Sequence, residues 1–152
     1  MREFTLYFDG SCEPTNPGGV ATAGWVLKEG TLQIAAGSKE ICRGPKATNN
    51  VAEYAALGFG LRHILDNFGG TAVDTLHIRG DSKLVVEQVA RRWKCNKEHL
   101  AKLRDRCLEL LEQIGCKWDS TWIPREQNTE ADALSQSAYV AATGNAYPRR
   151  RA

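Results

Sequence analysis

The sequence predicts an α/β domain in which a five-stranded mixed sheet, a three-strand antiparallel meander plus two further strands, is flanked by helices. Three segments with the period-two alternation of strands open the chain, and segments with helical spacing then alternate with two more strands. At 152 residues, 42% of them hydrophobic, the chain is long enough for one domain with its own core. We expect residues 1–142 to form this domain and residues 143–152, a basic tail without periodicity, to be disordered.

The first three strands are predicted from alternation and from turn residues. Every second residue from Glu3 to Asp9 is apolar, so the acid that ends this strand points away from the apolar face. Gly10-Ser11-Cys12 is then expected to be a turn. Strands over Ala21 to Lys28 and Leu32 to Ile41 follow, and their short connection predicts an antiparallel meander.

A helix is predicted from Asn50 to Phe68, because apolar residues recur there at helical spacing. Gly58 and Gly60 lower its helix propensity, which indicates close packing of this helix on the sheet. Gly69 and Gly70 end it in the manner of a C-cap.

The rest of the chain alternates between strands and helices, with stop signals such as Gly115 between them. The expected elements, in order, are a strand over Thr75 to Arg79, helices over Lys83 to Arg92 and Glu98 to Ile114, a strand over Lys117 to Ile123, a loop from Pro124 to Asn128 and a helix over Thr129 to Ala142.

Four carboxylates, Asp9, Glu53, Asp81 and Asp132, fall at boundaries between these elements. Each has an ordinary explanation: the first as an acceptor for turn amides, and the others as helix caps or first-turn acids that interact favourably with the helix dipole. However, strand ends and helix starts at one edge of an α/β sheet converge on the usual location of a site. Four acids so close cannot all ionise without cations, so the pattern points to divalent ions with oxygen ligands, of the kind that support attack on a phosphodiester.

Four short motifs contain these acids. They are Phe8-Asp9-Gly10-Ser11-Cys12 with Asn16-Pro17-Gly18-Gly19, then Thr48-Asn49-Asn50-Val51-Ala52-Glu53, then Gly80-Asp81-Ser82, and finally Ile123-Pro124-Arg125-Glu126-Gln127-Asn128-Thr129-Glu130-Ala131-Asp132. In this order they resemble type 1 ribonuclease H (ribonuclease HI), over nearly the whole chain from Arg2 to about Ala142.

The resemblance implies the ribonuclease H fold and endonucleolytic cleavage of the RNA strand of an RNA/DNA hybrid, leaving 5′-phosphate and 3′-hydroxyl ends. It also implies that Asp9, Glu53, Asp81 and Asp132 are catalytic residues that bind two Mg²⁺ ions, for which Mn²⁺ is a substitute. Two alternatives stay open: a 3′–5′ exonuclease of the same superfamily, and a hybrid-binding module without catalysis.

The same resemblance assigns substrate-binding roles. Selection of RNA requires contact with its 2′-hydroxyl groups. The residues that match positions along the RNA strand are Gly10, Ser11, Cys12 and Asn50, and those that match phosphate-facing positions are Asn16, Thr48 and Asn49. Ordinary turn and cap chemistry is the alternative for these Asn and Thr side chains.

The sequence departs from many family members in two places, and so resembles a compact form. The loop before the last acid lacks their histidine, and Arg125 is the nearest candidate for a phosphate contact there. The passage from Arg92 to Glu98 also leaves little room for the basic protrusion of bacterial-type members. The cations around Trp93 form a reduced version of that DNA contact or, alternatively, an ordinary charged surface.

Composition limits the remaining properties. The net charge of +2 is weak evidence for a polyanionic partner, although basic residues cluster near Trp93 and in Arg149 to Arg151. Five cysteines without a C-x-x-C motif indicate reduced, structural thiols, with one disulfide as an alternative in a hyperthermophile. With no signal peptide or membrane span evident, we expect a cytoplasmic monomer whose partner is the hybrid, with no membrane and no protein partner.

Overall fold

The computed structural model describes residues 1–70 and 72–148. Its strands are β1 (Glu3–Glu13), β2 (Gly18–Glu29), β3 (Leu32–Gly44), β4 (Thr75–Gly80) and β5 (Lys117–Trp122). Its helices are α1 (Asn49–Phe68), α2 (Lys83–Val89), α3 (Glu98–Ile114) and α4 (Thr129–Thr143), with a short 3₁₀ turn at Arg125–Gln127 in the segment predicted as a loop.

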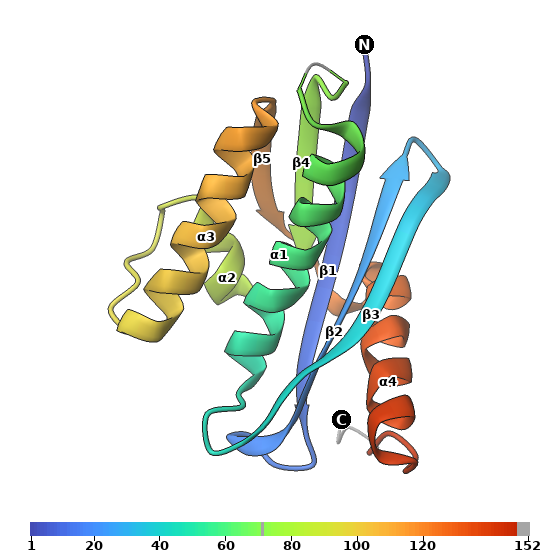
Figure 1. The fold of residues 1–152 in the computed structure, drawn as a ribbon, viewed down its shortest axis with the longest axis vertical. Helices are drawn as coiled ribbons and strands as arrows, with labels where there is room; N and C mark the ends of the chain where they lie inside the picture. The colour runs from blue at the N-terminus through green and yellow to red at the C-terminus, as the bar shows by residue number, and fades with distance from the viewer. Residues whose placement is uncertain (71, 149–152) are drawn as a thin grey trace.

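The five strands form one mixed sheet in the order β3-β2-β1-β4-β5 (Figure 1). β1, β2 and β3 pair antiparallel, as the meander predicts, while β4 pairs parallel to β1 and β5 parallel to β4. The predicted five-stranded mixed sheet flanked by helices is therefore confirmed. β1 lies at the centre, between the antiparallel β2 and the parallel β4.

Alternation along β1 assigns the two faces of the sheet. The buried Leu6 packs against Gly60 of α1, and α3 packs on α1 on the same side. Ser11, at an odd-numbered position like Asp9, instead lies 3.2 Å (Oγ to Oγ) from Ser135 of α4. In Figure 1, α4 lies beside β2 and β3, apart from the other three helices. Asp9 thus projects away from the apolar face, as the alternation predicts.

The prediction of a turn at Gly10-Ser11-Cys12 is wrong, because β1 continues through Glu13. The neighbouring strand β2 extends equally far, and it pairs Ala23 with Gly10 and Ala21 with Cys12. The backbone groups of this segment therefore form ladder hydrogen bonds with β2 instead of a turn, which extends the rigid strand beyond Asp9.

The two helix glycines pack differently from one another. A Cβ at Gly60 would lie 2.6 Å from Leu6 Cδ1, so this glycine does permit close packing on the sheet. A Cβ at Gly58 would meet only Cys107 Sγ of α3, at the ordinary contact distance of 3.9 Å. The predicted close packing of this helix on the sheet is therefore confirmed at Gly60, whereas Gly58 faces a groove between α1 and α3.

Other boundaries shift slightly. α2 ends at Val89, three residues before the predicted end, and Arg91 adopts a positive φ of 61°. Past α4, the Tyr147 ring packs edge-on against Tyr139, with centroids 5.5 Å apart. Arg149 to Ala152 lie outside the described residues, so disorder of the tail stays a prediction.

All five cysteines are unbridged, and no helix in the described ranges is long and apolar enough to span a membrane.

Candidate active site

Two of the predicted acids are brought together by the parallel pairing of β1 and β4. The register places Phe8 opposite Gly80, where β4 ends. Asp9 is the next residue of β1 and Asp81 is the first residue after β4, so the two acids are neighbours where β4 ends. The turn after Gly80 leads directly into α2.

Glu53 reaches the same place because α1 crosses β1 unusually closely. A Cβ at Gly10 would lie 2.3 Å from both Ala52 C and Glu53 N, and 2.6 Å from Ala52 O. Only a residue without a side chain fits between the strand and the backbone of α1. Gly10 therefore places the first turns of α1, and with them Glu53, beside Asp9.

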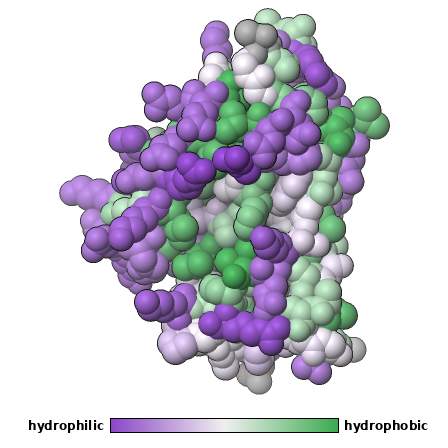
Figure 2. Space-filling model, in the orientation of Figure 1, coloured by the Kyte–Doolittle hydropathy of each residue, from purple (hydrophilic) through white to green (hydrophobic). Residues whose placement is uncertain are grey.

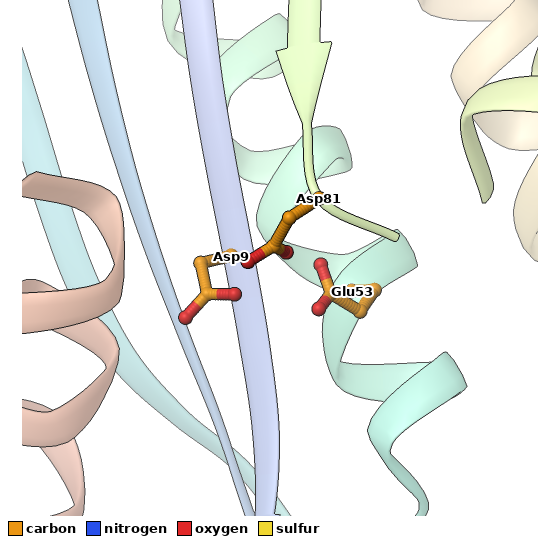
Figure 3. Close-up of side chains that lie close together, drawn as sticks. All are labelled: Asp9, Glu53 and Asp81. Atoms are coloured by element: carbon orange, nitrogen blue, oxygen red, sulfur yellow. The ribbon is translucent and has the colours of Figure 1, made fainter. Parts of the chain in front are cut away.

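The three carboxylates form a compact group, each offering an oxygen within 4.8 Å of the other two (Figure 3). Asp9 and Glu53 are buried, with 2% and 6% of their surface exposed, and Asp81 is half-buried. Figure 3 shows them converging from β1, from α1 and from the end of β4. Like charges this close and this buried repel strongly unless a cation lies between them. A set of oxygen donors only is the ligand set that Mg²⁺ and Mn²⁺ prefer.

Helix capping does not account for Glu53 or Asp81, because other side chains provide the caps. Thr48 Oγ1 accepts the hydrogen bond from Val51 N at the start of α1, at 3.1 Å. Ser82 Oγ accepts from Val85 N at the start of α2, at 3.3 Å. The capping alternative is therefore wrong for both acids.

Asp132 is close to this group in the fold but does not join it. It lies in the first turn of α4, where its Oδ2 accepts a hydrogen bond from Gln136 Nε2 at 2.9 Å. The start of α4 is held beside Asp9, because Asn128 Nδ2 donates to Phe8 O at 2.9 Å. The N-cap residue of α4 is Asn128, and Asp132 is one of two acids in the first turn of this helix, where the helix dipole favours negative charge.

A cavity of about 500 Å³ opens above the three acids. Of the predicted substrate-binding residues, those that line it are Gly10, Ser11, Cys12, Asn16, Asn49 and Arg125. Thr48, whose hydroxyl caps α1, and Asn50, in the first turn of that helix, do not line it.

A pair of amides forms part of the cavity wall. Asn16 Nδ2 donates to Asn49 Oδ1 at 2.9 Å, and Asn49 N donates to Asn16 Oδ1 at 3.1 Å. This reciprocal pair ties the loop after β1 to the start of α1. Cys12 lies deeper, where burial raises the pKa of its thiol and its Sγ donates to Ala47 O at 3.3 Å. Cys12 is therefore a neutral packing residue of the cavity wall.

Sequence reasoning missed several residues of the site, among them Trp122 and Asn128. Trp122, 44% exposed, lines the cavity and donates from Nε1 to Asp81 O at 3.2 Å. Asn128, 1% exposed, fixes α4 to β1. Nothing in the local sequence marks either contact, because each joins segments far apart along the chain.

Comparison with known proteins identifies the family. Residues 7–138 match the model of the reverse transcriptase-like family. The chain is 43% identical over 133 residues to ribonuclease HI of Halobacterium salinarum, a match that covers 87% of this chain and 62% of that protein. It belongs to the type 1 ribonuclease H family. The match spans less than two thirds of the length of these curated relatives: 62% of the Halobacterium salinarum protein and 35% of the bifunctional protein Rv2228c of Mycobacterium tuberculosis.

Solved structures of type 1 ribonucleases H share its fold. The N-terminal RNase H domain of Rv2228c superimposes with a TM-score of 0.83 at 34% identity, covering 95% of this chain and 98% of that chain. LC11-RNase H1, solved in complex with an RNA/DNA hybrid, superimposes with a TM-score of 0.82 at 26% identity, covering 91% of this chain and 98% of that chain. The ribonuclease H fold expected from the four motifs is confirmed.

Proposed function

We propose that this chain is an endoribonuclease that hydrolyses the RNA strand of RNA/DNA hybrids and leaves 5′-phosphate and 3′-hydroxyl ends. The observation that carries the proposal is the group of Asp9, Glu53 and Asp81 at the floor of an open cavity, in a chain of the type 1 ribonuclease H family. The complex of LC11-RNase H1 with an RNA/DNA hybrid supports the choice of substrate.

The acids fit a site for divalent cations. Asp9, Glu53 and Asp81 would hold the ions with Asp132, which lies on the adjacent first turn of α4. Bound Mg²⁺ or Mn²⁺ would act in such a site as a Lewis acid that lowers the pKa of a water and neutralises charge at the scissile phosphate. Two of the acids are buried, so the chain keeps these carboxylates away from competing water and in place for this task.

The side chains around the cavity suit a nucleic-acid strand. Asn16 and Asn49 hold one another, which fixes their amide groups at the cavity wall, where phosphate or sugar oxygens could accept from them. Arg125 also lines the cavity and is exposed, and its guanidinium can contact a phosphate with two hydrogen bonds. The exposed ring of Trp122 offers a surface on which a base or sugar can pack.

The test is cleavage of an end-labelled RNA/DNA hybrid beside matched duplex DNA and single-stranded RNA, with Mg²⁺, with Mn²⁺ and with a chelator. We expect metal-dependent internal cuts in the RNA strand of the hybrid alone. Binding without cleavage would favour the non-catalytic module, and a ladder that recedes from one 3′ end would favour the exonuclease. A monomeric state and a cytoplasmic location stay predictions from the sequence, and gel filtration beside the assay tests the first.

A further inference from the structure

A second hollow lies away from the active site, in the groove between α1 and α3. It has a volume of about 320 Å³ and is almost wholly apolar, with Gly58, Phe59, Leu103, Cys107 and Leu110 among its lining residues. Figure 2 shows hydrophobic surface on this face of the molecule, bordered by hydrophilic side chains. Phe59 is 37% exposed there, so its ring forms part of this apolar surface.

Gly58 leaves this hollow open, although the packing of α1 does not require a glycine at this position. Glycine inside a helix destabilises the helix relative to alanine. At Gly60 close packing requires the glycine despite this lower helix stability, because a Cβ would overlap Leu6. At Gly58 a Cβ would meet only Cys107 Sγ, at 3.9 Å, so the chain's own atoms would tolerate a side chain. The glycine therefore maintains empty apolar space that the fold does not require.

Cations border the hollow on both sides. Arg62 of α1 and Arg106 of α3 line it, and Lys39 Nζ of β3 lies 4.9 Å from the centroid of the Phe59 ring. The two arginines pair with Asp66 and Glu109 on their own helices, at 3.2 Å and 3.3 Å. Both ion pairs are more than half exposed and therefore weak, so an incoming anion can replace the partner carboxylates.

We propose that this groove binds a small amphiphilic anion, an aliphatic or aryl carboxylate or sulfonate. Its apolar body would lie over Gly58 and Cys107, and its acid group would lie between Arg62 and Arg106. Apolar walls with a few polar groups that fix orientation are the usual composition of small-molecule sites, and the volume falls within their range. The inference does not depend on the proposed function, because none of these residues lines the catalytic cavity.

The test titrates decanoate and, as a matched neutral probe, 1-decanol, into ¹⁵N-labelled protein. The amide of Gly58 is a reporter at the centre of the groove. We expect decanoate to shift the amides of α1 and α3 saturably, and to bind at least about tenfold more tightly than 1-decanol. Equal binding of the two probes, shifts centred on other elements, or no saturable shift at millimolar decanoate would each overturn the proposal.

Variants locate the site. Gly58→Leu fills the groove, and we expect it to weaken decanoate binding at least about tenfold while the protein stays folded. Gly58→Ala separates filling from misfolding, because it should raise the melting temperature and weaken binding only slightly. Arg62→Gln with Arg106→Gln should remove the preference for decanoate, whereas the control Arg104→Gln, on α3 but outside the groove, should leave it intact. Unchanged binding in Gly58→Leu would overturn the proposal.

Discussion

Gly10→Ala should disturb the placement of Glu53 without changing any of the acids. The added Cβ would lie 2.3 Å from the backbone of Ala52 and Glu53, whereas carbon atoms in contact sit about 3.5 Å apart. Backbone cannot rotate away as a side chain can, so α1 must move by roughly 1 Å relative to β1. Glu53 moves with it. Misplacement of a catalytic group by about 1 Å can lower the rate on the order of 100-fold.

The assay compares kcat/KM for hybrid cleavage with the melting temperature of each variant. Gly10→Ala should lower kcat/KM by roughly 100-fold and cost about 1–3 kcal/mol of stability through overpacking. Gly60→Ala is the matched control, because its Cβ would meet the end of the Leu6 side chain at 2.6 Å, far from the acids. It should lose comparable stability and keep its activity at temperatures where it is folded. A Gly10→Ala protein with near wild-type kcat/KM would refute the role of the close α1–β1 contact.

Three further predictions test individual side chains. Arg125→Ala should raise KM for the hybrid several-fold and leave metal-dependent cleavage detectable, whereas unchanged kinetics would remove Arg125 from the site. Burial opposes ionisation of Asp119, but hydrogen bonds from Arg79 and His77 outweigh it and hold the pKa of this carboxyl below its ordinary value of 3.8. The ionised Asp119 therefore stabilises the fold, by at most about 1 kcal/mol because the pair is exposed. This stabilisation is complete above the pKa of Asp119 in the unfolded chain, and it is lost as the pH falls through the lower pKa of the folded state. The melting-temperature gap between wild type and Asp119→Asn should accordingly close in acid, and a gap that stays constant from about pH 6 to about pH 2.5 would contradict it. Burial raises the pKa of Cys107 to about 12, so iodoacetamide at mildly alkaline pH should label Cys107 only after unfolding, as mass spectrometry would show.

The order of strands and helices was predictable because local patterns carry it. Alternation from Glu3 to Asp9 and helical spacing after Asn50 depend on neighbouring residues, and both elements occur as predicted. The ends of elements were less predictable. β1 runs on through Gly10 because β2 extends equally far to pair with it, and that pairing is a property of two segments.

The site was predictable as a set of acids but not as an arrangement. The four motifs name four acids, and the fold brings Asp9, Glu53 and Asp81 together, with Asp132 in the first turn of α4. What holds them there comes from tertiary contacts that no local pattern signals: the close approach at Gly10 and the bond from Asn128 to Phe8 O. The opposite behaviour of Gly58 and Gly60 has the same cause, since helix propensity is equal at both positions and only the packed neighbour differs.

The most direct test of the central claim is metal-dependent cleavage of an RNA/DNA hybrid by Asp9→Asn, with Asp66→Asn, an exposed acid of α1, as the control. The amide keeps the size of the side chain but removes its charge, so the protein should fold with a melting temperature near that of the wild type. We predict that Asp9→Asn loses cleavage in both Mg²⁺ and Mn²⁺ while Asp66→Asn retains it. A folded Asp9→Asn protein that cuts the hybrid at the wild-type rate would show that the three converging carboxylates are not the catalytic centre.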